Sequence, residues 1–493
     1  MTICLVVPPS PFLLDERVFM SLGVLRVAAV FEQAKAGRVE VLDLSGVSNF
    51  LDATAAHATL QKEGAAPIYG ITATSPQLPA AVKIAGTIRA VLPESRIILG
   101  GPHATLANAA AKREARRGRP GRGARAMAAL QRIFDVIVAG DGERAIFEAV
   151  RAPRGTVLDA DDRHSPYWLS DADLEVTPSP ARHLVDVASY HYKIDGAPAL
   201  SLIAQLGCPF GCTFCAGRNS PMLRHIRTRS AKSIVAEMVE LHGRYGCTGF
   251  MFYDDELNVN PNIVDLMEQI VAAQTELGVE WRLRGFVKAE LFTPQQAEVM
   301  RRAGFRWLLV GFESGSDRIL DNIAKRAAKE DNTRCVEIAH AAGLKVKALM
   351  SLGHAGESVE SICETTEWLL DVRPDDFDAT IITPYPGSPY YDDAVSNGEF
   401  WTYTARNGDR LHQNEVDYTA EADYYKGRPG DGYVAHVWTD HLKAHDLVRE
   451  RDQLEFSVRE RLGIPFNPSA PAIAYEHSMG QTSLPPNILR ASA

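Results

Sequence analysis

The chain has 493 residues and a mass of 54.0 kDa, and 46% of its residues are hydrophobic, 23% charged and 8% aromatic. This composition is typical of a folded protein with more than one domain, and it excludes disorder, a collagen-like structure and a coiled coil. The formal net charge of −10 argues against a dedicated nucleic-acid binder.

The sequence also indicates where the protein works. No run approaches the roughly 18 apolar residues that a membrane helix needs. Residues 1–8 have neither the basic segment nor the apolar stretch of a secretion signal. Seven cysteines in 493 residues do not make a disulfide scaffold. We therefore expect a cytoplasmic protein with no membrane partner.

Short apolar runs alternate with helical patterns in the first part of the chain. The runs predict strands at 3–7, 39–44, 68–73, 96–99 and 136–139. The helical patterns predict helices at 22–31 and 78–91 and one that begins at Ala145. Such alternation predicts a parallel, doubly wound sheet of the flavodoxin or Rossmann type over residues 1–158. Ligands bind such sheets beyond the carboxyl ends of the strands.

Glycines fall at these predicted strand ends. Gly100, Gly101, Gly140 and Gly142 leave backbone without side chains, so that a large ligand can approach. The first domain is therefore interpreted as a binding module. Residues 112–125, between the fourth and fifth strands, carry seven basic residues, one acid and three glycines. They predict a solvated, mobile surface insertion, with a docking patch for an acidic partner as the alternative.

A second alternation follows a linker rich in Asp, Pro and Ser at 159–195. Strands are predicted at 202–205, 250–253, 281–285, 307–311, 346–351 and 379–383, with a helix at 230–244. This pattern predicts an open or partly closed α/β barrel over residues 196–395.

The C-terminal region, 396–493, has one predicted helix at 436–462 and no periodicity from 467 onward. Its aromatic residues either close the barrel mouth or form the core of a small third domain. These residues are Phe400, Trp401, Tyr403, Tyr424 and Tyr425.

Three of the seven cysteines lie within eight residues. Cys208, Cys212 and Cys215 are separated by three and then two residues. Thiolates suit zinc or an iron–sulfur cluster. A structural zinc site needs four ligands, and His225 is the nearby candidate for a fourth. A cubane cluster on three cysteines instead leaves one iron open, which favours a catalytic cluster. The scattered cysteines are expected to be buried or indifferent thiols: Cys4, Cys247, Cys335 and Cys363.

The cysteine spacing after a strand, with Phe214 before the last cysteine, resembles the signature of the radical SAM superfamily. Four later segments resemble other blocks of that superfamily: Phe-Tyr-Asp-Asp at 252–255, Gly-Phe-Glu-Ser-Gly-Ser at 311–316, Leu-Gly-His-Ala-Gly-Glu at 352–357 and Pro-Tyr-Pro-Gly-Ser at 384–388. In the third segment, His354 and Ala355 replace the more usual pair that ends in proline.

This resemblance implies a [4Fe-4S] cluster on the three cysteines and a bound S-adenosylmethionine (SAM). The residues it implies for SAM are Phe214, Tyr253, Asp254, Asp255, Arg284, Glu313, Ser314 and Gly353. Read without the resemblance, Asp254 and Asp255 could cap the following helix.

The first domain resembles the cobalamin-binding domain that precedes many radical SAM barrels. The residues that carry this resemblance or are implied by it are Gly23, Thr74, Ser75, Gly100, Gly101, His103, Gly140, Gly142 and Glu143. The alternative is a flavodoxin-like domain that has lost its ligand or binds another nucleotide. Residues 8–20 contain no histidine, so we expect the lower face of cobalt to lack a histidine ligand. That absence fits the methylating branch of the radical SAM family.

The resemblance as a whole predicts a cobalamin-dependent radical SAM methyltransferase that acts on an unactivated carbon through a 5′-deoxyadenosyl radical and methylcobalamin. The alternative keeps the same cofactors but catalyses cyclisation, ring contraction or rearrangement. A third hypothesis is a cobalamin- or light-responsive regulatory protein with a vestigial barrel. We expect a small-molecule or peptide substrate and an external electron donor of the flavodoxin or ferredoxin type. Nucleic acid is not an expected partner.

Overall fold

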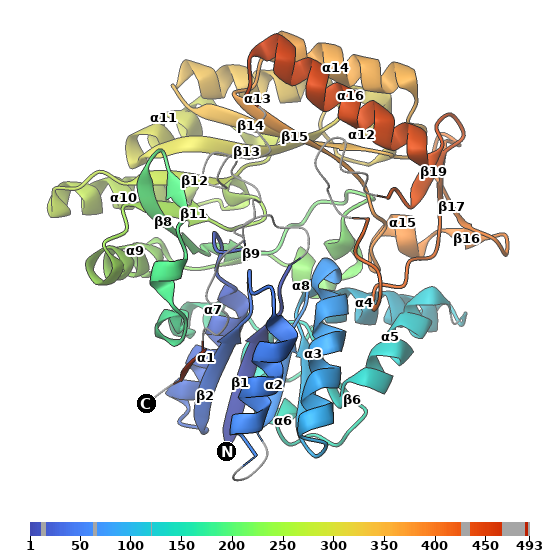
Figure 1. Cartoon of the computed structure of the whole chain (residues 1–493). Coiled ribbons are helices and arrows are strands. Elements are labelled where there is room, and N and C mark those ends of the chain that lie inside the picture. The colour runs from blue at the N-terminus through green and yellow to red at the C-terminus, as the bar shows by residue number, and fades with distance from the viewer. Residues whose placement is uncertain (11–15, 63–66, 120, 425–433, 466–488, 492–493) are drawn as a thin grey trace.

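The computed structural model describes residues 1–10, 16–62, 67–119, 121–424, 434–465 and 489–491. It contains two seven-stranded sheets, and the first lies below the second in Figure 1. One hydrophobic core runs from the first sheet into the second, through residues such as Leu25, Leu184 and Leu202. The two sheets are therefore packed as one body around a continuous apolar interior.

The first sheet confirms the predicted doubly wound domain. Its strand order is β20-β2-β1-β3-β4-β5-β6, and every neighbouring pair is parallel except β2 with β20. The strands are β1 (Thr2–Val7), β2 (Arg38–Asp43), β3 (Ile68–Thr72), β4 (Arg96–Gly100), β5 (Val136–Ala139), β6 (Thr156–Asp159) and β20 (Leu489–Ala491).

Helices cover both faces of this sheet. One face carries α1 (Leu22–Gln33) and α6 (Gly142–Ala149), which pack on each other. The other face carries α2 (Phe50–Leu60), α3 (Leu78–Val91), α4 (Pro102–Arg116) and α5 (Arg122–Ile133). Helix α3 at 78–91 and strand β5 at 136–139 begin and end where the sequence predicts them.

The prediction of a mobile insertion at 112–125 is not how the structure holds this segment, although residues 117–119 are exposed as expected of a solvated one. Residues 112–116 end α4 and residues 122–125 begin α5, and Glu114 joins the two helices by accepting hydrogen bonds from the backbone N–H groups of Gly121, Gly123 and Ala124 at 2.8 Å each. Four of its basic residues contact residues between 391 and 415 of the same chain: Arg113 and Arg117 with Asp393, Arg125 with Glu415, and Arg122 over the rings of Tyr391 and Trp401. The acidic partner of the alternative interpretation is thus part of the same molecule.

The second sheet is a half-open barrel, as predicted. Its order is β15-β14-β13-β12-β11-β8-β7, with β7 and β15 at its edges. The parallel strands are β8 (Ala197–Leu202), β11 (Gly249–Phe252), β12 (Arg282–Phe286), β13 (Phe305–Glu313), β14 (Lys345–Leu352) and β15 (Asp376–Ile381), and β7 (Lys193–Ile194) pairs antiparallel with β8.

The first barrel strand lies at 197–202 and not at the predicted 202–205. The reason is the carboxylate of Asp254, which accepts hydrogen bonds from the backbone N–H groups of Ala204 and Gln205 and so turns the chain out of the sheet. The next residues form β9 (Gln205–Leu206), which pairs with β10 (Arg227–Thr228) outside the barrel.

Helices cover the outer face of the barrel. They are α9 (Ala231–Tyr245), α10 (Ile263–Leu277), α11 (Pro294–Ala303), α13 (Lys329–Ala341), α14 (Val359–Val372) and α16 (Ala444–Leu462). The predicted helix at 436–462 begins only at Ala444, because residues 437–439 form strand β19 (Val437–Thr439) of a small antiparallel sheet. The other strands of that sheet are β16 (Val395–Ser396), β17 (Trp401–Thr404) and β18 (Arg410–Gln413).

The C-terminal aromatic residues pack in two places. Tyr424 lies against Tyr385 and Tyr418, and Tyr418 and Tyr424 belong to the core of the first domain. Phe400 packs on Trp438 within the small sheet. Tyr425 and the non-periodic stretch 467–488 lie outside the described residues.

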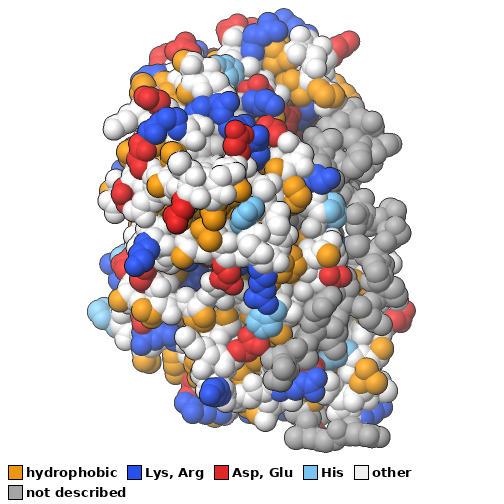
Figure 2. All heavy atoms as spheres, turned by 90° about the vertical axis from the view of Figure 1, so that its left-hand side faces the viewer, with side chains coloured by type: hydrophobic (Ala, Val, Ile, Leu, Met, Phe, Trp, Pro, Cys, Tyr) orange, Lys and Arg blue, Asp and Glu red, His pale blue; other side chains and the backbone are white. Residues whose placement is uncertain are grey.

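The helices of the described residues and one face of the molecule bear on possible membrane and nucleic-acid partners. Among the described residues, no helix combines the length and apolar character that a bilayer crossing requires. Figure 2 shows basic and acidic side chains interspersed over the described part of the face turned to the viewer.

Candidate active site between the two sheets

The three clustered cysteines lie on a loop at the end of the first barrel strand. This cysteine loop, residues 207–216, begins at Gly207, whose φ of +90° and whose closeness to the carbonyl oxygen of His225 leave no room for a Cβ atom. The Cys208 N–H donates to the carbonyl of Leu223 at 2.9 Å, and the Cys215 N–H donates to that of Cys212 at 3.2 Å. The backbone of the loop is therefore held before any metal binds.

The chemistry of this loop fits an iron–sulfur cluster better than zinc. A structural zinc site is closed by four protein ligands, and the loop supplies three thiols. The ring of His225 packs on Trp168 and its Nε2 lies 3.9 Å from Asp171, so the structure does not support it as a fourth ligand.

The cysteine thiols must lose their protons to become ligands, and nearby positive charge favours that loss. Burial, with the neighbouring negative charges, raises the pKa of Cys208 to about 11. Burial also raises the pKa of Cys212, and the charges of Lys325 and Lys288 oppose that rise. Bound iron would supply the charge that these thiolates require.

Sequence reasoning missed the two lysines beside the cysteine loop. Lys288 follows β12, and its Nζ lies 4.3 Å from the ring centre of Phe210 and 2.7 Å from Glu290. The Nζ of Lys325 donates to Glu313 at 3.1 Å. Both side chains are buried, and a lone lysine after a strand or, like Lys325, after the helix α12 (Asp317–Asn322) gives no sequence signal for such a place.

The structure brings several predicted SAM residues together. Phe214 packs edge-on against the ring of His354 at 5.2 Å. Glu313 has a φ of +68° and accepts from the hydroxyl of Ser351 at 2.7 Å, and Ser351 lies 2.8 Å from the Nε2 of His354. A non-glycine residue in the left-handed region is strained, which is characteristic of functional sites.

The other predicted SAM residues divide into buried and accessible ones. Asp254 is buried, and its carboxylate accepts hydrogen bonds from backbone N–H groups. Arg284 is also buried, and its Nη1 donates to the hydroxyl of Tyr192 at 3.0 Å. Ser314 contacts the Thr365 hydroxyl at 3.1 Å, and Gly353 packs against Ile381 and Val437. Asp255 and Tyr253 are exposed. The assignment of these residues to SAM stays a prediction.

A cleft of about 450 Å³ lies between the two sheets. Its lower wall is made by the carboxyl ends of the central strands of the first sheet and by the start of α1, and its upper wall by Ile203, Leu206, Leu223 and Tyr253. The wall is mainly apolar, and its size suits a large organic ligand. Among the described lining residues there is no histidine.

Most of the residues predicted for cobalamin line this cleft: Gly23, Thr74, Gly100, Gly101, Gly140, Gly142 and Glu143. A Cβ atom on Gly23 or Gly100 would meet no atom within 4 Å, so these glycines keep the cleft open. Ser75 and His103 are instead buried beside it and contact each other at 2.8 Å, and burial lowers the pKa of His103 to about 4.

Two buried polar atoms of the cleft wall fit a ligand rich in amides. The hydroxyl of Ser10 and the Nη2 of Arg26 have no hydrogen-bond partner within the described chain, and both residues line the cleft. Buried polar groups are normally satisfied, so a donor and an acceptor from a bound ligand would complete them. The cleft therefore fits cobalamin by its apolar walls and its unsatisfied polar atoms.

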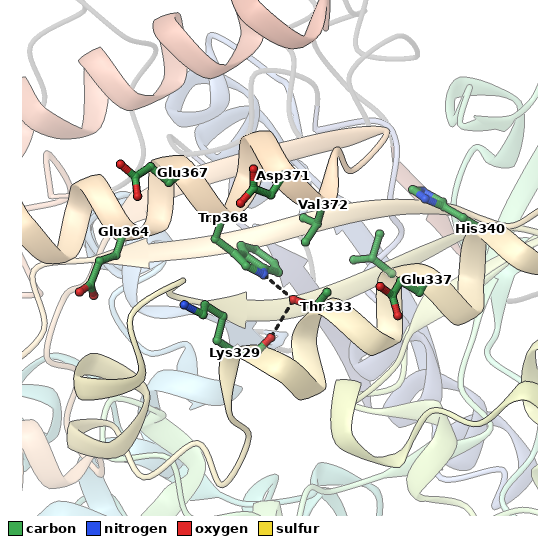
Figure 3. A pocket seen from close by; sticks show the side chains of 10 residues that line it. Lys329, Thr333, Glu337, His340, Glu364, Glu367, Trp368, Asp371 and Val372 are labelled. Atoms are coloured by element: carbon green, nitrogen blue, oxygen red, sulfur yellow. Dashed lines mark hydrogen bonds between the residues drawn. The ribbon is translucent and has the colours of Figure 1, made fainter.

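A second hollow, of about 370 Å³, lies between α13 and α14 on the outside of the barrel. Figure 3 shows Trp368, whose indole N–H donates to the Thr333 hydroxyl at 2.9 Å, and Thr333, which donates to the carbonyl of Lys329 at 3.0 Å. The carboxylates of Glu364 and Glu367 point away from the indole ring. No residue predicted for a cofactor lies there, so this hollow is separate from the candidate site.

Comparison with known proteins agrees with this geometry. Residues 202–369 match the family model of the radical SAM superfamily. The chain is 26% identical to an uncharacterized methyltransferase of Pyrococcus horikoshii, over 69% of this chain and 72% of the relative. It is 24% identical to the anaerobic magnesium-protoporphyrin IX monomethyl ester cyclase of Cereibacter sphaeroides, over 69% of this chain and 55% of that enzyme.

Solved structures share the fold. The radical SAM methyltransferase TsrM from Kitasatospora setae, with cobalamin and a [4Fe-4S] cluster bound, superposes with a TM-score of 0.60 at 15% identity, over 82% of this chain and 81% of TsrM. The cobalamin-dependent SAM radical enzyme OxsB superposes with a TM-score of 0.55 over 78% of this chain and 54% of OxsB. Both have a fold like that of this chain across its two sheets.

Proposed function

We propose that this chain, whose residues 202–369 form a radical SAM domain, is a cobalamin-dependent radical SAM methyltransferase that acts on an unactivated carbon. The observation that carries the proposal is the shared cleft. The glycine-lined strand ends of the first sheet and the residues that flank the cysteine loop, Leu206 and Leu223, line one cavity. A cofactor in the first domain and one in the barrel would then face each other.

Each cofactor would be held by its own set of residues. Cys208, Cys212 and Cys215 would hold the cluster, and the accessible Asp255 and Tyr253 would contact SAM. The cleft residues would hold cobalamin without a histidine on cobalt. When bound, these groups together supply an electron, a hydrogen-abstracting radical and a methyl group. An electron donor of the flavodoxin or ferredoxin type would deliver the electron.

The chain's own residues position these groups and exclude water. Asp254 fixes the backbone that enters the cysteine loop by binding two of its N–H groups. Lys288 and Lys325 supply positive charge beside the thiolates. The apolar wall of the cleft, with Leu5, Val7 and Ile98, keeps solvent from a reactive carbon radical.

A specific observation favours a second outcome. The identity with the magnesium-protoporphyrin cyclase extends over the same share of the chain as the identity with the methyltransferase of Pyrococcus horikoshii. An enzyme with the same cofactors but without net methyl transfer therefore remains the competing function. The substrate, a small molecule or a peptide, would enter the same cleft in either case.

The test does not require the substrate. Full-length protein is reconstituted anaerobically with iron, sulfide and hydroxocobalamin, and is then reduced in the presence of SAM. We expect 5′-deoxyadenosine, together with one equivalent each of S-adenosylhomocysteine and methylcobalamin. Deoxyadenosine without S-adenosylhomocysteine would favour the cyclase-like function. A nitrogen triplet in the electron paramagnetic resonance of the cob(II)alamin form, or no cobalamin binding at all, would contradict the proposed site.

A further inference from the structure

We propose that the first domain holds a structural zinc ion on Cys4, Glu40 and His57, on the face of the sheet opposite the cleft. A sulfur, a carboxylate oxygen and an imidazole nitrogen from these residues all lie within 4.8 Å of one another. This inference does not depend on the proposed function. It uses residues that no cofactor discussed above contacts.

The sheet register places the three side chains together. Cys4 of β1 is paired with Glu40 of β2 on one side and with Tyr69 of β3 on the other. Register partners on neighbouring strands point to the same face, so the thiol, the carboxylate and the phenol form one row. Helix α2 covers this face and brings His57 onto the row, where its ring contacts Tyr69 edge-on at 5.6 Å.

The row is enclosed in apolar surroundings. Cys4, Glu40 and His57 are 0%, 2% and 4% exposed, and the cluster around Cys4 includes Val6, Leu42 and Ile71. Burying a carboxylate and an imidazole in such a place is costly unless they are paired or bind a metal. Glu40 is paired with His57 and with Arg38, at 3.1 Å each, and a metal would take its place beside these contacts. Neighbouring residues of β1, Leu5 and Val7, line the cleft instead, so the site lies on the other side of the sheet.

The donor set is suited to zinc. Thiolate, imidazole and carboxylate are its three usual protein ligands, whereas magnesium and calcium prefer oxygen alone. The hydroxyl of Tyr69 lies 3.1 Å from Nδ1 of His57 and holds Nε2 toward Glu40, also at 3.1 Å. A hydrogen bond to the second ring nitrogen is how proteins orient a histidine ligand.

The fourth position has a candidate as well. The side-chain amide of Gln61 lies 3.3 Å from the carboxylate of Glu40, and a rotation of that amide would present its oxygen to the metal. Zinc binding forms one bond each to sulfur, oxygen and nitrogen and releases the thiol proton of Cys4 to solvent. No oxidant or reductant is involved.

The experiment separates this site from the cysteine loop. Full-length protein in which Cys208, Cys212 and Cys215 are all replaced by Ala is expressed with added zinc, and its zinc content is measured by mass spectrometry. We expect about one zinc per chain, with one sulfur scatterer at about 2.3 Å in X-ray absorption. Adding Cys4→Ala to this background should remove the zinc. Adding Cys247→Ala, which replaces a buried thiol of the barrel domain, should leave it in place.

A second variant, which leaves every ligand in place, tests the site with less risk of misfolding. Tyr69→Phe keeps every ligand and should weaken zinc binding by about 10-fold or more in a chelator competition, because it removes the hydrogen bond that orients His57. Zinc far below one per chain in the background protein would overturn the proposal. Equal zinc with and without Cys4, or a zinc site without a sulfur ligand, would overturn it too.

Discussion

The two sheets carry different chemistry at their candidate cofactor sites. The ends of the first sheet offer glycines and apolar side chains, whereas the barrel side brings thiols, lysines and carboxylates next to the cysteine loop. Strand ends without side chains fit a bulky ligand held mainly by shape, and charged groups around a thiol loop fit a metal cluster and a zwitterion held by electrostatics. Under the proposed function each sheet would hold its own cofactor, and substitutions on either side should affect one without the other.

The largest effect is expected on the barrel side. Cys208→Ala, Cys212→Ala or Cys215→Ala should abolish both the cluster iron and SAM cleavage, because three thiolates are the minimum for the proposed cluster. Cobalamin binding should persist in these variants. Iron analysis, deoxyadenosine assays and cobalamin absorbance check the prediction, with Cys335→Ala as the control, since Cys335 is a thiol on the buried side of the outer helix α13. Normal iron in a loop variant would contradict the ligand assignment.

The matching change in the first sheet is Gly100→Leu. The side chain would project into the open cleft, where a Cβ atom meets nothing within 4 Å, so the fold should survive. Affinity for hydroxocobalamin should fall about 100-fold or more, since the ligand and the leucine would compete for the same volume. Iron content should not change. Gly86→Leu on the exposed side of α3 is the control, because it is equally unobstructed but lies outside the cleft.

Two neighbouring carboxylates on the barrel side sharpen the comparison further. Asp255→Ala should weaken SAM binding by about 10- to 100-fold, as expected for the loss of a charge-assisted hydrogen bond of about 1.5–3 kcal/mol. Its melting temperature should remain close to wild type because the residue is exposed. Asp254→Ala should instead lower the melting temperature, because two buried backbone N–H groups lose their acceptor. The reverse pattern in calorimetry and thermal melts would exchange their roles.

The stability of the first domain should also depend on pH, through His103. Burial lowers the pKa of His103 to about 4, below its ordinary value of 6.5. The folded state therefore favours the neutral ring, and this contribution is fully present above pH 6.5 and lost as the pH falls toward 4. Between pH 7 and pH 5 the loss should be about 2 kcal/mol. His103→Gln should show a correspondingly flatter stability profile in urea unfolding, and an unchanged slope would contradict the assignment.

The smallest effect is expected where the two parts contact each other at the surface. Arg125→Ala removes an exposed pair with Glu415 and should change the free energy of unfolding by less than about 1 kcal/mol. Arg122→Ala should cost more, because the buried guanidinium lies 3.7 Å from the ring centre of Tyr391 and donates to Gln413 at 2.8 Å. Equal losses of unfolding free energy for the two variants, measured in urea, would show that burial does not determine the strength of these contacts.

The sequence predicted the elements that depend on local pattern. Residues 78–91 and 136–139 carry an unbroken periodic or apolar signal, and the structure confirms their bounds. It misplaced the first barrel strand because the turn after it is set by Asp254, about 50 positions away. It missed strand β19 because its pairing with β18 is the decisive interaction.

The same distinction applies to the candidate site. The cysteine motif and the glycines at the strand ends are local features, so the sequence predicts them. The different surroundings of Asp254 and Asp255, adjacent in sequence, could not be predicted, because only the tertiary structure decides which carboxylate is buried. The basic segment at 112–125 was misread for the same reason, since its acidic partner Asp393 lies about 280 positions further along the chain.

The strand β20 has a consequence for how the first domain can be studied. It pairs with β2 through Glu40, Val41 and Leu42, and it thereby covers one border of the sheet with residues from the other end of the sequence. An uncovered border of this kind exposes a row of unpaired N–H and C=O groups to which a strand of another molecule can add. Residues 1–158 expressed alone would lack this cover and are expected to self-associate along β2. The chain thus covers a border of its first sheet with residues about 450 positions further along the sequence.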